Sequence, residues 1–311
     1  MKKPVIIVIA GPTASGKTSL SIELAKSIEG EIISADSMQI YKEMNIGTAK
    51  VTKEEMENIK HYMIDFVSPD NRYSVADYKK DATIAIESII KSGKTPIIVG
   101  GTGLYIDSLI YEIEFNEIET DLEYRKELEN IVEKEGLEVL YKQALEIDSK
   151  AMEKISTNDK KRILRVLEIY HQTGKTKTEL EKESRKKETK YEYIVFAIDM
   201  PREILYERIN KRVDIMINQG LIQEVENLEK KYNKFPTAMQ GLGYKEVVEY
   251  LRKETTKEEM IEKIKQETRR YAKRQLTWFR KNKEITWLNG LDNTKDNVKI
   301  ICEKIKEKRN G

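Results

Sequence analysis

Gly11-Pro12-Thr13-Ala14-Ser15-Gly16-Lys17-Thr18 is the stretch that decides the fold, because it matches the phosphate-binding pattern G-x-x-x-x-G-K-[ST]. Its glycines let successive backbone N–H groups curl around an anion, and the helix that follows adds the positive end of its dipole. Lys17 supplies a mobile cation, and the Thr18 hydroxyl is suited to ligate Mg²⁺. We therefore predict that residues 11–18 form a P-loop that holds a diphosphate group.

An apolar, β-branched run over residues 3–10 precedes this loop and predicts a central parallel strand. Further strands are expected at 31–35, 61–67, 95–99, 191–200 and 285–288, with helices over 19–28 and 74–91. Strands that alternate with helices are typical of a doubly wound parallel sheet. The predicted fold class is α/β, with a P-loop NTPase-like parallel sheet core that carries a helical insertion.

The pattern changes between about residues 112 and 190, where strand signals vanish and the sequence becomes helical and dense in charge. An apolar strand then returns. This order predicts a helical insertion at 112–190 within a core built from 1–111 and 191–290, followed by a basic tail at 291–311.

Composition limits the possible classes of protein. Hydrophobic residues make up 39% of the 311-residue chain, and no apolar run reaches the length of a membrane span. A single cysteine, Cys302, excludes an intrachain disulfide, and with only His61 and His171 beside it a structural zinc site is not expected. We expect a reduced, cytoplasmic protein that does not engage a membrane.

Polar residues follow two of the predicted strands, at the edge of the sheet where open α/β folds bind ligands. Asp36 follows the second strand and is a candidate Mg²⁺ ligand or general base, or else it caps the turn after it. Thr102 follows the fourth strand and either hydrogen-bonds a substrate or serves its own glycine-rich turn. Asp65 is the candidate for the second acid that a kinase or ATPase would want.

Two groups of basic residues each allow two interpretations. Arg208 and Arg212 share a helix face, where they either neutralise a leaving phosphate or form surface salt bridges. The run from 263 to 283 holds nine Lys or Arg against one acid, Glu267, as a solvated helix face or a nucleic-acid surface would.

Further blocks of sequence accompany the P-loop in a specific order. They are Ile33–Tyr41, Ile46–Lys50, Gly100–Thr102, Asn158-Asp159 with Arg162 and Arg165, Gly243–Lys245 and Arg274–Trp278. Together with the P-loop they resemble the tRNA dimethylallyltransferase (isopentenyl-tRNA transferase) family. The resemblance extends from Gly11 to about Trp287, and the blocks around Asp36 and Gly47 are its specific part.

This resemblance implies an activity and its cofactor. The family transfers a dimethylallyl group from dimethylallyl diphosphate to the N6 amine of adenosine 37, beside the tRNA anticodon, and releases diphosphate. It implies Asp36 as the general base, with Thr102 and Lys17 as further catalytic residues and Mg²⁺ held by Thr18 and Asp36. Arg208 and Arg212 would join the P-loop around the diphosphate.

The resemblance also implies contacts with the tRNA anticodon stem-loop. The residues concerned are Asp36, Ser37, Met38, Gln39, Thr102, Arg125, Lys161, Arg162, Ile163, Leu164, Arg165, Gln240, Gly241, Leu242, Gly243, Tyr244 and Lys245. The chain departs from some relatives at Lys160, where they have proline, and at Gln240-Gly241, where they have a more basic pair. In view of the family, the basic run at 263–283 is interpreted as a clamp on RNA phosphates.

Two other functions remain open on the residues alone. A small-molecule kinase would use ATP on the same loop, and a non-catalytic RNA-binding protein would use only the basic helix. The expected partners are tRNA and dimethylallyl diphosphate, and the chain is expected to act as a monomer.

Overall fold

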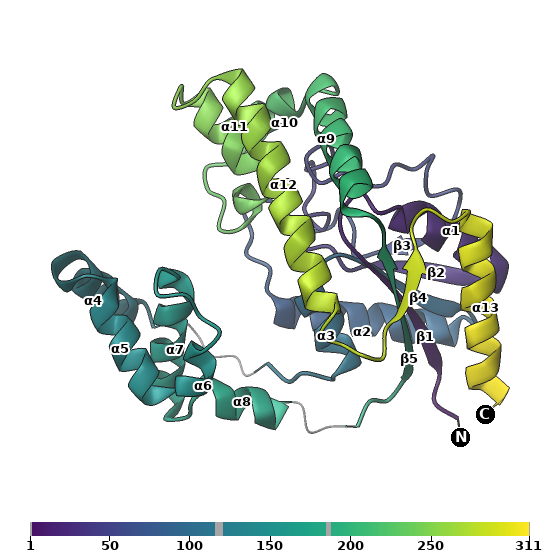
Figure 1. Ribbon diagram of the computed structural model, residues 1–311, viewed down its shortest axis with the longest axis horizontal. Coiled ribbons are helices and arrows are strands. Elements are labelled where there is room, and N and C mark those ends of the chain that lie inside the picture. The colour runs from purple at the N-terminus through teal and green to yellow at the C-terminus, as the bar shows by residue number, and fades with distance from the viewer. Residues whose placement is uncertain (1, 116–120, 185–187, 311) are drawn as a thin grey trace. The chain divides into compact units, whose positions relative to one another are not determined.

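The structure is a computed structural model that describes residues 2–115, 121–184 and 188–310. The chain divides into two compact units (Figure 1). Met1–Ile110 and Thr189–Gly311 form unit 1, and Tyr111–Glu188 form unit 2. Each unit has its own hydrophobic core.

Unit 1 is built on a six-stranded sheet in which all neighbouring strands are parallel. Its strands are β1 (Val5–Ala10), β2 (Gly30–Ser34), β3 (His61–Tyr62), β4 (Thr95–Gly100), β5 (Glu192–Asp199) and β6 (Thr286–Asn289). They lie in the order β3-β2-β4-β1-β5-β6, so β1 is central. The predicted α/β fold class is confirmed.

The third strand is shorter than predicted. The sequence pattern gives a strand over 61–67, but β3 ends at Tyr62. Met63 and Asp65 have φ angles of 62° and 59°, which turn the backbone out of the extended conformation. Val67 pairs instead with Tyr41 in an isolated parallel bridge. The prediction is therefore wrong beyond Tyr62.

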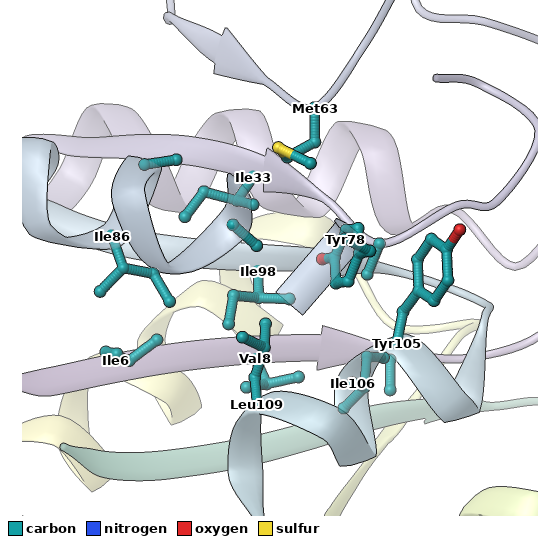
Figure 2. Packing of buried hydrophobic residues seen from close by; sticks show 14 of the residues in the cluster. Ile6, Val8, Ile33, Met63, Tyr78, Ile86, Ile98, Tyr105, Ile106 and Leu109 are labelled. Atoms are coloured by element: carbon teal, nitrogen blue, oxygen red, sulfur yellow. The ribbon is translucent and has the colours of Figure 1, made fainter. Parts of the chain in front are cut away.

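One face of the sheet packs against α2 (Val75–Lys91) and α3 (Gly103–Ile110). Ile6 and Val8 of β1 are fully buried on this face, with Tyr78 of α2 beside them (Figure 2). Strands alternate their side chains between faces, so the intervening residues of β1 point to the other side.

The opposite face is covered by α1 (Lys17–Ile28) and α13 (Thr294–Asn310), which pack against each other. Ile7 and Ile9 of β1 are buried in this core, together with Ile301 of α13. The C-terminal segment that we expected as a basic tail is thus a helix that contributes to the core of unit 1 (Figure 1).

The remaining helices of unit 1 surround a third core. They are α9 (Arg202–Asn218), α10 (Leu221–Lys231), the short 3₁₀ helix η1 (Ala238–Gln240), α11 (Tyr244–Leu251) and α12 (Lys257–Phe279). The longest of them, α12, begins at a capping box in which Thr256 and Glu259 satisfy each other's backbone N–H groups. Among the helices of the described ranges, none is long and apolar enough to cross a bilayer.

Unit 2 consists of helices around a small apolar core. They are α4 (Leu122–Glu135), α5 (Leu137–Ile147), α6 (Ser149–Met152), α7 (Lys160–Thr173) and α8 (Lys177–Ser184). Leu140, Ile163 and Leu164 are completely buried in this core.

One buried carboxylate, Asp148, connects two of these helices. Its Oδ1 accepts the Ala151 N–H of α6 at 3.0 Å and the Thr178 hydroxyl of α8 at 2.6 Å. Its Oδ2 accepts the Thr178 N–H at 2.8 Å. Asp148 is only 4% exposed, so these hydrogen bonds form largely out of water and define how α8 attaches to α6.

We expect Asp148→Ala to lower the free energy of unfolding by about 2–3 kcal/mol, since it removes a helix cap and leaves two donors of Thr178 unsatisfied. Urea unfolding followed by circular dichroism would measure the loss. Glu153→Ala, at an exposed position one turn away, is the control. A loss no greater than that of the control would contradict the role of Asp148.

Candidate active site

The P-loop connects the end of β1 to the first turn of α1. Gly16 has a φ of 92°, a backbone conformation that residues with a Cβ rarely adopt. There is space for a Cβ at this position, since its nearest neighbour would be Ser19 Oγ at 4.0 Å, so the backbone angle is what favours glycine. The Ser15 hydroxyl is buried and has no hydrogen-bond partner among the residues that the structure describes. A phosphate oxygen on this loop would give that hydroxyl the partner that a buried polar group requires.

Lys17 lies folded over the loop, where its Nζ donates a hydrogen bond to Pro12 O at 2.6 Å. Burial and then the nearby charge of Arg212 lower the pKa of Lys17 to about 7, against the opposing effect of Asp36. The amine is therefore only partly charged at neutral pH until an anion binds beside it.

Of the two arginines predicted to bind diphosphate, the structure brings one to the loop. Arg212 Nη1 lies 3.4 Å from the Thr13 hydroxyl, and burial lowers the pKa of this arginine. Arg208 is on the same helix, one turn earlier, but it is exposed. The geometry therefore supports Arg212 as a phosphate ligand more directly than Arg208.

Asp36 directly follows the second strand and caps the turn after it. Its Oδ1 accepts the N–H groups of Met38 at 2.9 Å and Gln39 at 3.3 Å. Because both of these bonds end on Oδ1, Oδ2 is the oxygen that can take a proton. Burial lowers the pKa of both Lys17 and Arg212, and the charge of Asp36 partly opposes this, so the carboxylate lies near both cations.

Thr102 lies at the end of the neighbouring strand and is tied to the Asp36 turn. Its Oγ1 accepts the Ser37 N–H at 3.1 Å, and its own N–H donates to Ala35 O at 3.1 Å. There is no space between the two strand ends, since a Cβ on Gly100 would lie 2.1 Å from Ala35 O. The structure thus brings Thr102 and Asp36 together.

Gln275 of α12 is a site residue to which the sequence analysis assigned no role. It is 5% exposed, and its Oε1 accepts the Thr13 N–H of the P-loop at 2.9 Å. Its Nε2 donates to Gly101 O, also at 2.9 Å. A Cβ on Gly101 would lie 2.0 Å from that nitrogen, so a larger residue at position 101 would displace the Gln275 amide.

Tyr271 lies one helical turn before Gln275 and completes this side of the site. Its phenol lies near the side chains of Thr102 and Gln275. Burial and the negative charge of Asp36 raise the pKa of Tyr271 to about 12, so the phenol keeps its proton at neutral pH. The block at 274–278 includes Gln275 but does not indicate what that residue contacts, and it does not include Tyr271.

In unit 2, two of the predicted tRNA contacts share one buried carboxylate. Arg125 Nη1 lies 3.0 Å from Glu168 Oε1, and Arg165 Nη1 lies 3.4 Å from Glu168 Oε2. Glu168 is 1% exposed, whereas both arginines are partly exposed. Glu168 thus holds two cations in place, and a second acid, Glu129, lies 3.3 Å from Arg125 Nε.

The other predicted tRNA contacts differ in burial. The side chains of Ile163, Leu164 and Tyr244 are buried in hydrophobic cores, so we no longer expect them to touch RNA. Gly241 and Gly243 are also buried, and Leu242 is partly exposed. Lys161, Arg162, Gln240 and Lys245 are exposed, and Ser37, Met38 and Gln39 are partly exposed beside Asp36.

Two further contacts concern residues of the sequence analysis. Met38 lies against Gly241, since a Cβ there would be 3.3 Å from Met38 Cε, so the segments 36–39 and 240–245 meet. Asp65, the candidate second acid, instead accepts a hydrogen bond from Lys50 Nζ at 2.6 Å.

The residues near the loop fit a magnesium ion only in company with a substrate. Within 2–115, 121–184 and 188–310, no three His, Cys, Asp or Glu side chains gather as a metal site would need. Thr18 and Asp36 offer one hydroxyl and one carboxylate. Mg²⁺ typically binds to one or two carboxylates together with substrate phosphates and water, so this donor set suits a metal that arrives with a diphosphate.

A separate cavity of about 710 Å³ lies beside α12, between α9 and the ends of β5 and β6. Lys273, Leu276 and Arg280 line it. By helical spacing these residues face away from Tyr271 and Gln275. The residues that line this cavity do not include Lys17 or Asp36.

Fold and site together define a P-loop protein with cations around the phosphate-binding loop and a carboxylate close by, as a transferase acting on a diphosphate compound requires. The protein-family model described as IPP transferase matches residues 39–282. The chain belongs to this family.

Individual relatives agree with this assignment. The chain is 53% identical over 297 residues to a tRNA dimethylallyltransferase of Acetivibrio thermocellus, which covers 95% of both chains. A crystal structure of tRNA delta(2)-isopentenylpyrophosphate transferase from Staphylococcus epidermidis is 43% identical, with a TM-score of 0.72 over 98% of this chain and 100% of the other. A eukaryotic dimethylallyltransferase acting on tRNA is 34% identical, with a TM-score of 0.77 over 93% of this chain and 74% of the other.

We expect the affinity for inorganic pyrophosphate to depend on the titration of Lys17. The ammonium form, which binds the anion, predominates below pH 7 and is lost above it, so affinity should fall by up to about tenfold per pH unit above 7. Calorimetric titration between pH 6 and 9 would measure this. Pyrophosphate itself titrates in this range, but it does so equally for both proteins. The dissociation constant of Lys17→Met divided by that of the unaltered protein at each pH therefore isolates the contribution of Lys17. A ratio that does not change with pH would contradict the assignment.

Proposed function

We propose that this chain transfers a dimethylallyl group from dimethylallyl diphosphate to N6 of adenosine 37 in tRNA and releases diphosphate. The observation that carries the proposal is a carboxylate, Asp36, whose charge acts on both cations at the P-loop, Lys17 and Arg212. Family membership and relatives named tRNA dimethylallyltransferase support it. They favour prenyl transfer over the kinase that the P-loop alone allows and over a non-catalytic RNA-binding protein.

The diphosphate end of the donor binds to the loop from Gly11 to Thr18. Backbone N–H groups, the Ser15 hydroxyl and the cations Lys17 and Arg212 surround it. The C–O bond to the allylic carbon breaks during transfer, and the negative charge that develops on the leaving diphosphate is stabilised by these fixed donors. Mg²⁺, held by Thr18 and Asp36 together with the phosphates, would supply further charge neutralisation.

Asp36 acts on the acceptor, as the general base for the adenine amine. The exocyclic amine of adenine is a poor nucleophile because its lone pair is delocalised into the ring. As the bond from N6 to the allylic carbon forms, one amine proton passes to Asp36 Oδ2. Proton removal by a positioned carboxylate contributes about 10²–10⁴ in rate. Thr102, held beside Asp36 through Ser37, and Gln39 lie where the base would enter.

The target adenosine must leave its stack, which in a single-stranded loop requires about a few kcal/mol. Phosphate contacts hold the RNA meanwhile. We assign them to exposed or partly exposed cations, namely Arg125, Lys161, Arg162, Arg165 and Lys245. The monomeric state and the cytoplasmic location stay predictions.

We expect Asp36→Asn to abolish most transfer while preserving the fold of the site. An asparagine Oδ1 can still accept the N–H groups of Met38 and Gln39, but its amide cannot take a proton. The test is incubation with labelled dimethylallyl diphosphate and unmodified tRNA, with label counted in the RNA. The rate should fall by about 10²–10⁴.

Binding of tRNA to the Asp36→Asn protein, measured by filter retention, should stay within about twofold of the unaltered protein, since phosphate contacts dominate affinity. Transfer by the variant within about a factor of two would show that Asp36 is not the base, because a general base supplies far more. No label in RNA with the unaltered protein would refute the proposed function itself.

A further inference from the structure

Glu224, in the first turn of α10, accepts hydrogen bonds from three consecutive backbone N–H groups of a distant segment. Its Oε2 lies 2.9 Å from Asn45 N and 2.8 Å from Ile46 N, and its Oε1 lies 3.1 Å from Gly47 N. Hydrogen bonds to an ionised carboxylate are roughly twice as strong as neutral ones. This side chain therefore determines the position of the loop at 45–47.

Tyr244, at the start of α11, holds the same carboxylate from the other side. Its hydroxyl donates to Glu224 Oε1 at 2.7 Å, and the residue is only 1% exposed. Its ring lies directly against Gly47, where an added Cβ would be 2.5 Å from Tyr244 Cε2. The blocks at 46–50 and 243–245 thus pack on each other and on Glu224.

The loop held by Glu224 in turn orients Gln39. Hydrogen bonds from Ala49 N to Ile46 O and from Lys50 N to Asn45 O close the loop. The carbonyl oxygens of Thr48 and Ala49 each accept a hydrogen bond from Gln39 Nε2 at 3.3 Å. Because both partners are acceptors, they fix which end of the Gln39 amide is the nitrogen.

Gln39 is also joined to the proposed general base, since its N–H donates to Asp36 Oδ1. A continuous series of hydrogen bonds therefore runs from Glu224 through the loop to Gln39 and Asp36. Glu224 itself is partly exposed, and its neighbours on α10, Leu221 and Val225, belong to the third core.

We propose that Glu224 is a positioning residue for prenyl transfer, which orients the Gln39 amide toward the acceptor nucleotide through the loop at 45–50. This inference rests on the proposed function. Glutamine at position 224 has nearly the same shape, but it offers one acceptor oxygen in place of two and turns an NH₂ group toward backbone N–H donors. The loop must then shift, and the Gln39 amide shifts with it.

The test is a double-mutant cycle with Glu224→Gln and Gln39→Ala, read as kcat/KM for tRNA in the labelled-donor assay. Glu224→Gln alone should lower kcat/KM by about 10–100-fold, the scale of a small misplacement of a positioning group. When Gln39 is already alanine, Glu224→Gln should lower kcat/KM by about twofold or less, because the Gln39 amide that Glu224 positions is then absent. Glu229→Gln, an exposed position on the same helix, is the matched control and should have no effect.

A second readout separates positioning from general damage. The affinity of Glu224→Gln for inorganic pyrophosphate should stay within about twofold of the unaltered protein, since the P-loop is not part of the series. If Glu224→Gln does not fold, Tyr244→Phe removes one hydrogen bond to the same carboxylate and should give a smaller loss with the same dependence on Gln39.

Equal losses with and without Gln39, an equal loss of pyrophosphate affinity, or no difference from Glu229→Gln would each overturn the inference. All of these outcomes require that the unaltered protein transfers label. They are therefore distinct from a failure of the proposed function, in which the unaltered protein transfers none.

Discussion

A single buried amide, that of Gln275, holds the phosphate-binding loop against the end of the neighbouring strand. One end of the amide accepts the Thr13 N–H and the other donates to Gly101 O. A buried amide that lost either partner would be left with an unsatisfied polar group, at about 1–3 kcal/mol. The loops after β1 and β4 thus have a defined separation, and the rest of the site is arranged around them.

The charges at the P-loop suit an anionic ligand. Burial and then the charge of Arg212 lower the pKa of Lys17, and Asp36 offsets this only in part. Lys17 donates to Pro12 O in the meantime. In the proposed reaction, an incoming diphosphate would supply further negative charge, and the same cations would favour its departure with the electrons of the broken bond.

Much of the fold follows from local patterns in the chain. Strand β1, the P-loop and α1 are recognisable because an apolar run, a glycine loop and an amphipathic helix succeed one another within 28 residues. The convergence of Asp36 and Thr102 follows from the rule that parallel strands present their carboxyl ends at one edge. The length of β3 is overestimated from the sequence because the hydrophobicity pattern does not reveal the positive φ angles at Met63 and Asp65.

The residues that sequence reasoning missed share a physical feature. Gln275 binds backbone atoms of Thr13 and Gly101, and Glu224 binds backbone N–H groups at 45–47. A contact between a side chain and a distant backbone demands no particular residue type from its partner, so no pattern along the chain predicts it. The same limit explains Ile163, Leu164 and Tyr244, whose burial depends on packing that a motif does not describe.

The central claim is that backbone amides near the start of the chain bind an isoprenoid diphosphate. A crystal structure with a non-hydrolysable thio analogue of dimethylallyl diphosphate tests it most directly. The account predicts phosphate oxygens about 3 Å from the N–H groups of residues 11–18, with Lys17 Nζ moved from Pro12 O to the ligand. Phosphates found instead in the cavity lined by Lys273 and Arg280, with Lys17 still on Pro12 O, would contradict it.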